Sequence, residues 1–363
     1  MAPHILHIFP SFATGGVQLR IVDIANRLGD TFTHTALALD GRTEAAARVW
    51  PETSFVAKAD PRWPSRFTAL PALRRCVRSY SPDLVCTYNW GSMHWAFAAA
   101  TLTLPHLHFE SGFSVDEATA PRLRRSLFRR LALRRVKALV VPSKTLFELA
   151  RARRWARAGR LRWIVNGVDV SYYRRAEAPL PQTMEKPRIV SVAPLRREKR
   201  LDRLIAAAAS LGRRVELCLC GDGPERAALA AMAGEAGGHA EVVFLGNQTD
   251  IRPALEQSDV FAITSQTEQM PNALLQAMAM ALPVVAFDAG DIRRILPEPQ
   301  RAFVFAQDDE RGFRDGLAAL LQDPALRRRL GGLNRAGVNA EYSMEDMVAA
   351  YRALYEDAIG GKQ

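Results

Sequence analysis

The chain alternates short apolar runs of strand length with longer amphipathic runs, and this alternation constrains its fold more than any other feature. In the first half, the runs that predict strands are residues 5–9, 35–39, 84–87, 107–110, 138–141 and 163–165. The runs that predict helices are residues 16–28, 65–78, 93–101, 122–135 and 143–157. Strands that alternate with helices are typical of a parallel, doubly wound sheet with helices on both faces.

The alternation stops at a polar, proline-bearing stretch and then restarts. We interpret residues 174–187 as a linker between two domains. Beyond it, strands are predicted at residues 188–192, 215–220, 242–245, 260–264, 284–287 and 302–305. Helices are predicted at residues 200–210, 225–233, 251–257, 272–280, 310–322, 324–335 and 344–359. The predicted fold is therefore α/β, with Rossmann-like domains at residues 1–173 and 188–343.

Length and composition agree with a two-domain globular protein. The chain has 363 residues, of which 48% are hydrophobic and 24% are charged. We find no apolar run of membrane-spanning length, and the first residues lack the features of a secretory signal. The four cysteines are predicted to be buried free thiols in a reducing compartment, so we expect a cytoplasmic protein. They are Cys76, Cys86, Cys218 and Cys220.

The positive charge of the chain is concentrated in its first half. Residues 1–178 hold 27 Lys and Arg against 13 Asp and Glu, a net charge of +14, whereas residues 179–363 hold 22 against 25, a net charge of −3. The stretch from Arg122 to Lys137 reads as a basic amphipathic helix, which suits an anionic membrane surface or the phosphates of a lipid-diphosphate acceptor. The alternative is an ordinary surface helix. No recognisable DNA or RNA module accompanies the charge, so nucleic acid is not a predicted partner.

One segment of the second half carries the clearest chemistry. Glu268 stands at a predicted loop end, Pro271 follows at a predicted first helical position, and an apolar helix and a strand come directly behind. The amides of a first helical turn and the helix dipole favour an anion. Glu268 would stand beside that anion, where it can accept hydrogen bonds from neutral donors such as sugar hydroxyls. Open α/β sheets bind ligands at such strand ends.

This segment resembles the signature of retaining glycosyltransferases of family 4, which have the GT-B fold of two Rossmann-like domains facing across a cleft. The family pattern is a Glu, seven residues and a second Glu; here the first is Glu268 and Gln276 replaces the second. Further similarity lies in short motifs that occur in family order over nearly the whole chain. They are Phe9-Pro10-Ser11 with Gly15-Gly16-Val17-Gln18, Asn166-Gly167-Val168-Asp169, Leu195-Arg196-Arg197-Glu198-Lys199 and Gly221-Asp222-Gly223-Pro224.

In the second domain, the resemblance implies a site for a nucleoside diphosphate sugar. Lys199 would face the diphosphate, and Arg196 could reach the same phosphate because Pro194 occupies the position of the family's Arg. Glu268 would contact hydroxyls of the transferred sugar, and Gln276 would bind the ribose, less strongly than a carboxylate. The remaining predicted contacts are Gly246, toward the base, and Met270, Pro271, Asn272, Ala273 and Leu274. The alternatives are a surface Arg/Lys cluster and a Glu that only complements the helix dipole.

In the first domain, the resemblance implies the acceptor side. Gly15 and Gly16 would let the backbone approach a ligand closely, although turns alone explain most such pairs. His108 would contact the donor sugar near the reaction centre, with Glu110 on the same strand face; the alternative is a core histidine bonded to a neighbour. The resemblance also implies that a last helix, within residues 344–363, crosses back to the first domain.

The predicted function is that of a retaining hexosyltransferase. It would move a sugar from a nucleoside diphosphate sugar to a hydroxyl of a saccharide or lipid-linked saccharide, in the synthesis of surface polysaccharide. The resemblance implies no metal ion and no cofactor. Pro194 and Gln276, at two positions where the family has charged residues, motivate an alternative: a nucleotide-sugar-binding protein with little or no turnover.

Overall fold

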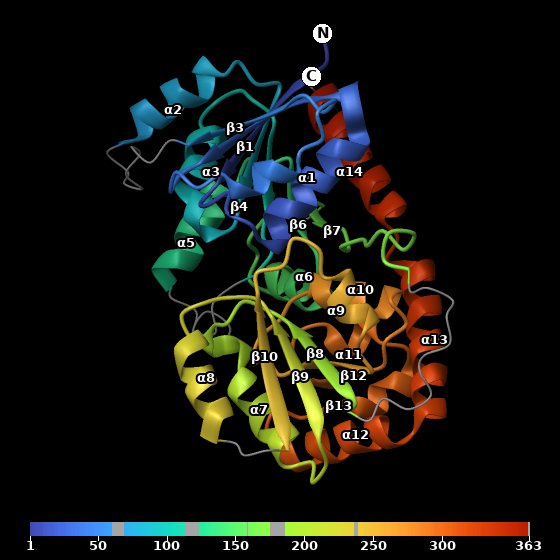
Figure 1. The fold of residues 1–363 in the computed structure, drawn as a ribbon. Helices are drawn as coiled ribbons and strands as arrows, with labels where there is room; N and C mark the ends of the chain where they lie inside the picture. The colour runs from blue at the N-terminus through green and yellow to red at the C-terminus, as the bar shows by residue number, and fades with distance from the viewer. Residues whose placement is uncertain (60–68, 113–122, 158, 175–185, 236–238, 362–363) are drawn as a thin grey trace. The chain divides into compact units, whose positions relative to one another are not determined.

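The computed structural model describes residues 1–59, 69–112, 123–157, 159–174, 186–235 and 239–361 (Figure 1). The chain forms two compact units, Met1–Asn166 with Glu345–Gln363, and Gly167–Met344. Most of the predicted linker at 174–187 lies outside the described residues, as do Arg122 and the start of the helix predicted at 65–78.

The first unit is built on a parallel sheet of seven strands in the order β3-β2-β1-β4-β5-β6-β7. The strands are β1 (His4–Phe9), β2 (Thr33–Ala38), β3 (Phe55–Ala59), β4 (Leu84–Tyr88), β5 (His106–Phe109), β6 (Ala138–Val141) and β7 (Leu161–Trp163). Strand β3 was not predicted, because no residue in it is buried and Lys58 interrupts its apolar run. The parallel sheet itself confirms the predicted class.

Helices connect these strands and cover the sheet. They are α1 (Gly16–Leu28), α2 (Leu70–Ser79), α3 (Met93–Ala100), α5 (Leu123–Ala132), α6 (Lys144–Ala152) and α14 (Met344–Gly360). Ser143 caps α6 by accepting a hydrogen bond from the amide of Leu146 at 3.1 Å. Helix α14 packs against strand residues of this unit: the ring of Tyr351 stacks on Phe109, with centroids 5.5 Å apart.

The second unit holds a parallel sheet of six strands in the order β10-β9-β8-β11-β12-β13. Its strands are β8 (Arg188–Val192), β9 (Val215–Cys220), β10 (Ala240–Gly246), β11 (Val260–Ile263), β12 (Val284–Phe287) and β13 (Val304–Phe305). Its helices are α7 (Leu201–Ala209), α8 (Arg226–Glu235), α9 (Arg252–Glu256), α10 (Asn272–Ala279), α11 (Ile292–Ile295), α12 (Glu310–Gln322) and α13 (Pro324–Glu341). One apolar core joins the sheet to α7 and α12.

Each sheet has one point at which the strand order changes direction. In the first unit it lies between β1 and β4, and in the second between β8 and β11. The loops that leave two such strands diverge to opposite faces of the sheet, which leaves a crevice at the carboxyl ends of the strands. The fold therefore points to the β8–α7 and β11–α10 loops as a place for a ligand in the second unit.

Candidate functional site

Two loops meet at the switch point of the second sheet. The loop after β8 carries a short 3-10 turn, Arg197–Lys199, before α7 begins. The loop after β11 is tied to this turn twice. The hydroxyl of Thr264 donates to the carbonyl of Lys199 at 3.0 Å, and the amide of Gln266 donates to the carbonyl of Glu198 at 2.9 Å. These bonds fix the start of one loop against the end of the other.

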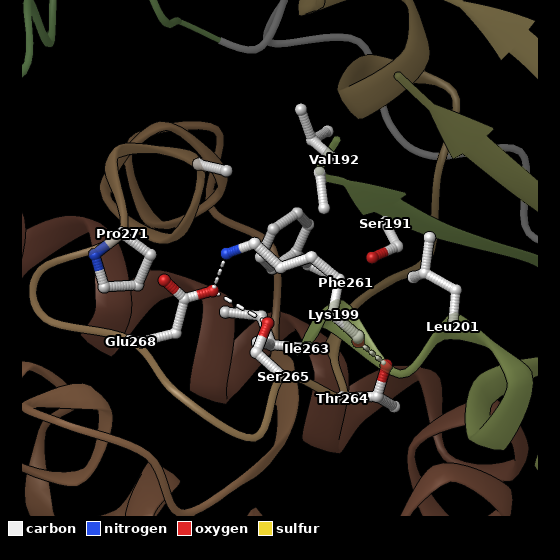
Figure 2. A pocket seen from close by; sticks show the side chains of 12 residues that line it. Ser191, Val192, Lys199, Leu201, Phe261, Ile263, Thr264, Ser265, Glu268 and Pro271 are labelled. Carbon is white, nitrogen blue, oxygen red and sulfur yellow. Dashed lines mark hydrogen bonds and ion pairs between the residues drawn. The ribbon is translucent and has the colours of Figure 1, made fainter. Parts of the chain in front are cut away.

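Lys199 and Glu268 face each other from these two loops. Figure 2 shows the Lys199 ammonium pointing to the Glu268 carboxylate, and its Nζ lies 2.5 Å from Oε1. The hydroxyl of Ser265 donates to the same oxygen at 2.7 Å. The Lys199 and Glu268 side chains are 17% and 13% exposed, so the pair is shielded but still reachable. A cation and a carboxylate that remain reachable can each exchange the other for a ligand group.

The pair lies in a small pocket that the start of α10 borders (Figure 2). The pocket is lined by Ser191, Val192, Ala193, Lys199, Leu201, Phe261, Ile263, Thr264, Ser265, Glu268, Pro271 and Ala273. Pro271 occupies the N-cap position of α10, one residue before the first helical position that the sequence predicts for it. No side chain accepts a hydrogen bond from the first amides of this helix. The positive end of the α10 dipole and Lys199 therefore both favour an anion in this pocket.

The loop after β12 packs against the backbone of Glu268. Gly290 has a φ of +56°, and a Cβ at this position would lie 2.0 Å from the carbonyl oxygen of Glu268. The amide of Asp291 donates to the carbonyl of Gln269 at 3.2 Å. Sequence analysis missed Gly290, because only the fold brings this loop beneath Glu268. It also missed Ser265, whose one sequence signal is a polar residue directly after a strand.

The other residues predicted in the second unit lie in different settings. Gln276 donates through Nε2 to the hydroxyl of Tyr173 at 2.9 Å, a partner that the sequence did not reveal. Leu274 is fully buried and Met270 is 7% exposed, so only their backbone groups can contact a ligand. Gly246, at the end of β10, has a φ of +68° and its carbonyl accepts from the amide of Gly221 at 2.8 Å.

Arg196 and Asn272 flank the pocket without lining it. Arg196 is exposed and caps the 3-10 turn that ends at Lys199. Asn272 is half-buried and is the first residue of α10. The predicted contacts of these residues with a ligand stay predictions, as do those of Gly246 and Gln276.

In the first unit, the predicted glycine loop opens α1 directly after β1. Gly15 is the residue that caps α1 and Gly16 is the first residue of the helix. This places both at the β1/β4 switch point of the first sheet. Their predicted approach to a ligand is a role that this position permits.

His108 lies in a buried polar cluster of the first unit. Its Nδ1 is 2.7 Å from the hydroxyl of Thr87, which is also 2.8 Å from Nε2 of His106, so the two histidines share one strand face. Nε2 of His108 is 3.8 Å from Oε2 of Glu110, and Arg129 donates to the same oxygen at 3.2 Å. His108 and Glu110 are both fully buried. This is the setting of the alternative reading, a core histidine bonded to its neighbours, and the contact of His108 with a sugar stays a prediction.

The described residues hold no group of three or more His, Cys, Asp or Glu side chains placed to bind a metal ion. The four cysteines are buried and free, as predicted. Burial raises the pKa of Cys218 to about 12 and that of Cys220 to about 11, which keeps both thiols protonated and unreactive at neutral pH.

Two family models match successive halves of the chain. The model of glycosyltransferase family 4 matches residues 14–172, and the model of glycosyl transferases group 1 matches residues 174–335. Together they extend over most of the sequence: the first match includes strands β2 to β7 and the second includes strands β8 to β13.

Curated relatives match this chain over about half of their own length. N-acetyl-alpha-D-glucosaminyl L-malate synthase of Bacillus anthracis is 27% identical over 173 residues, 47% of this chain and 45% of the relative. The lipopolysaccharide core biosynthesis glycosyltransferase LpsE of Rhizobium meliloti is 30% identical over 177 residues, 49% of this chain and 52% of the relative. The chain thus spans about half the length of the curated relatives it matches.

Solved structures resemble the chain over nearly its full length. Anabaena Alr3699/HepE in complex with UDP and glucose superposes with a TM-score of 0.82 at 17% identity, covering 98% of this chain and 100% of that one. Sucrose-phosphate synthase from Thermosynechococcus elongatus gives a TM-score of 0.78 at 18% identity, covering 98% and 99%. These likenesses show the fold, and the two family models show the ancestry. The chain therefore belongs to the family 4 glycosyltransferases and has their GT-B fold.

Proposed function

We propose that this chain is a retaining glycosyltransferase that uses a nucleoside diphosphate sugar as donor. The observation that carries the proposal is the contact of Lys199 with Glu268 at the β8/β11 switch point, beside the start of α10. The site offers one cation and a helix N-terminus for an anion, and one carboxylate for neutral hydroxyl groups. A sugar joined to a diphosphate has both kinds of group next to each other.

Sugar transfer places its largest charge change at the leaving diphosphate. As the glycosidic bond breaks, negative charge grows on the β-phosphate. Lys199 and the α10 dipole would stabilise that charge more in the transition state than in the ground state, which is the requirement for catalysis. Glu268, released from Lys199, would accept hydrogen bonds from the sugar and hold its anomeric carbon at the phosphate.

Retention follows if the acceptor attacks on the face that the diphosphate leaves. In this proposal the acceptor oxygen forms the new bond to the anomeric carbon as the old carbon–oxygen bond breaks. The acceptor proton passes to the departing phosphate oxygen, so no protein nucleophile takes part. The role of the protein is to position the donor and stabilise the leaving group.

The names of the relatives support a hexose donor and a saccharide acceptor. LpsE is described as a lipopolysaccharide core glycosyltransferase, and a matching protein of Mycobacterium tuberculosis is described as a GDP-mannose-dependent mannosyltransferase. Anabaena Alr3699/HepE was solved with UDP and glucose. We propose a hydroxyl of a saccharide or lipid-linked saccharide as acceptor, in the synthesis of surface polysaccharide.

A paired binding and turnover assay tests the function. The purified chain is titrated with UDP, GDP and ADP, and the matching nucleotide sugars are then followed for hydrolysis and for transfer to saccharide and lipid-linked acceptors. We expect binding of one nucleotide and turnover of its sugar, with retained anomeric configuration by NMR. Binding without turnover over the whole panel would instead favour the nucleotide-sugar-binding protein, and an inverted product would overturn the retaining mechanism.

We also propose that α5 and the turn after it bind an anionic membrane surface from the cytoplasmic side. Leu127 and Leu131, four residues apart on α5, are 60% and 49% exposed. Exposed basic residues surround them: Arg124, Arg130, Arg134, Arg135 and Lys137. Exposed apolar side chains among arginines suit the boundary between lipid head groups and acyl chains. None of the described helices is long and apolar enough to cross a membrane.

Vesicle sedimentation tests this surface. We expect the protein to bind vesicles that contain phosphatidylglycerol, to release at high salt, and to ignore pure phosphatidylcholine vesicles. Replacing Leu127 and Leu131 together by Gln should weaken the binding about tenfold. Leu333→Gln, at a 36%-exposed leucine of α13, is the matched control. Equal binding of the double variant and the wild type would overturn the assignment.

A further inference from the structure

Tyr173 makes a hydrogen bond that gives it a place in the candidate site. Its hydroxyl accepts from Nε2 of Gln276 at 2.9 Å, although 103 residues separate the two in sequence. A tight turn brings Tyr173 there. The carboxylate of Asp169 accepts from the amides of Ser171 at 3.1 Å and Tyr172 at 2.9 Å, and the amide of Tyr173 donates to the carbonyl of Asp169 at 2.9 Å.

Gln276 lies within one helical turn of the pocket. It is half-buried on α10, three residues after Ala273, which lines the pocket beside Lys199 and Glu268. Residues three apart on a helix share a face, so Gln276 continues the pocket face along α10. A ligand that extends from the pocket along this face of α10 would reach the side chain of Gln276.

In the structure, the bond to Tyr173 orients the amide of Gln276 with Nε2 toward the phenol. A primary amide carries a donor nitrogen and an acceptor oxygen, and it can turn either one outward. With Nε2 held by the phenol, Oε1 is the end that remains to accept. A ribose presents hydroxyl donors, so an amide locked in this orientation suits a ribose, whereas an amide free to rotate would offer the acceptor only part of the time.

We propose that Tyr173 is a positioning residue for the nucleoside, which holds Gln276 so that its Oε1 accepts from a ribose hydroxyl of the donor. This inference rests on the proposed function and adds to it the residue that orients Gln276, whose contact with the ribose the family resemblance already implies. A carboxylate at position 276 has no donor to give and would need no such orientation. The phenol is therefore the feature that lets a neutral amide serve at this position.

Tyr173→Phe tests the proposal, with Tyr172→Phe as matched control. Tyr172 is the neighbouring, 43%-exposed tyrosine, and its ring packs on the Arg252 guanidinium. The wild type is titrated with UDP, GDP and ADP, and the tightest of the three becomes the probe. We expect Tyr173→Phe to weaken that nucleotide about five- to tenfold, and to raise the KM of its sugar by the same factor while kcat stays within about twofold. Tyr172→Phe should match the wild type.

Pyrophosphate and deoxynucleotides separate positioning from a general structural role. Pyrophosphate has no ribose, so its affinity should be the same in Tyr173→Phe as in the wild type. This also verifies that the variant is folded. The 2′-deoxy and 3′-deoxy forms of the probe should show which ribose hydroxyl is bound. The form that lacks this hydroxyl should bind the wild type weakly, and its affinity should not fall further in Tyr173→Phe. The double variant with Gln276→Ala should bind no more weakly than Gln276→Ala alone.

Three results would overturn the proposal: unchanged nucleotide affinity in Tyr173→Phe, an equal loss of pyrophosphate affinity, or additive losses in the double variant. These three results can be distinguished from the result expected if the proposed function itself is wrong. In that case the wild type would bind neither the nucleotides nor pyrophosphate.

Discussion

Lys199 and Glu268 neutralise each other across 2.5 Å, and in the proposed function each would exchange the other for a different ligand group. A phosphate would take the place of the carboxylate at Lys199, and sugar hydroxyls would take the place of the ammonium at Glu268. Because both side chains are largely shielded from water, the exchange occurs where charge interactions are stronger than in bulk solvent. The hydroxyl of Ser265 also donates to this carboxylate.

Glu268→Gln should separate binding from turnover. The amide keeps the shape of the side chain but is a weaker acceptor for sugar hydroxyls, and it no longer neutralises Lys199. We expect sugar transfer to fall about 100-fold or more, while UDP or another accepted nucleotide diphosphate binds at least as tightly as to the wild type. Steady-state kinetics and calorimetric titration measure the two effects.

Glu298→Gln is the matched control, because Glu298 is an exposed carboxylate of the same unit that does not line the pocket. It should keep wild-type turnover. Wild-type turnover in Glu268→Gln as well would remove Glu268 from the site.

Sequence alone could predict the principal residues of the site but not the residues that support them. Lys199 and Glu268 each follow a strand, and the strand order of a doubly wound sheet brings the two loops together. Gly290 and Tyr173 carry no comparable signal. Gly290 is significant only because the fold brings it against Glu268, where a Cβ would lie 2.0 Å from the carbonyl oxygen. Tyr173 is significant only because a turn distant in sequence reaches Gln276.

At the scale of elements, helix α10 depends on helix α13 for its position. A Cβ on Gly331 of α13 would lie 2.0 Å from the carbonyl oxygen of Ala281, directly after α10, where the chain has a φ of +55°. The next residue, Gly332, is exposed and has nothing within 4 Å of its Cβ position. The two neighbouring glycines of one helix therefore allow a substitution at a closely packed position to be compared with the same substitution at an open one.

Gly331→Ala and Gly332→Ala should change stability in opposite directions. The first forces backbone apart and should lower the free energy of unfolding by about 1–3 kcal/mol or more. The second adds a better helix former at an open position and should raise it by about 0.5–1 kcal/mol. Denaturant unfolding measures both. Equal effects in the two variants would contradict the close packing of α13 on the end of α10.

The elements that sequence predicted well are those with a continuous apolar pattern. Strands β8, β9 and β12 and helix α12 have the predicted bounds, because burial in one core sets most of their pattern. Helix α1 of the first unit also has the predicted bounds, and seven of its residues are buried. Strand β3 was missed because it is largely exposed, and α11 because four residues are too few for a helical period. Pro271 was placed one residue too late in the helix, which is the ordinary error at helix ends.

At the scale of the whole molecule, buried histidines make the first unit sensitive to acid. Nε2 of His7 lies 3.0 Å from Nδ1 of His34, and both rings are buried. Burial, with nearby histidines, lowers the pKa of His34 and of His106 to about 3, and it lowers that of His7 well below its usual value. These rings are neutral in the folded unit and become protonated in the unfolded chain below about pH 6.5.

The unfolded chain therefore binds more protons than the folded unit between about pH 3 and 6.5, so stability is complete above that window and is lost as the pH falls through it. Within the window, each histidine lowers the free energy of unfolding by about 1.4 kcal/mol for each unit that the pH falls. For three histidines, we expect the free energy of unfolding of the first unit to be about 4 kcal/mol lower at pH 5.5 than at pH 7.5.

Urea unfolding at the two pH values, followed by hydrogen exchange to distinguish the units, provides the measurement. His239→Asn, at an exposed histidine of the second unit, should leave the pH dependence unchanged. A first unit of equal stability at pH 5.5 and 7.5 would show that these histidines are not buried as neutral rings.

The most direct test of the central claim is a crystal structure of the chain with its preferred nucleoside diphosphate. The account predicts that a β-phosphate oxygen lies about 3 Å from Nζ of Lys199, at the start of α10, with Glu268 no longer paired to the lysine. A nucleotide whose phosphates lie elsewhere, with Lys199 and Glu268 still in contact, would contradict it.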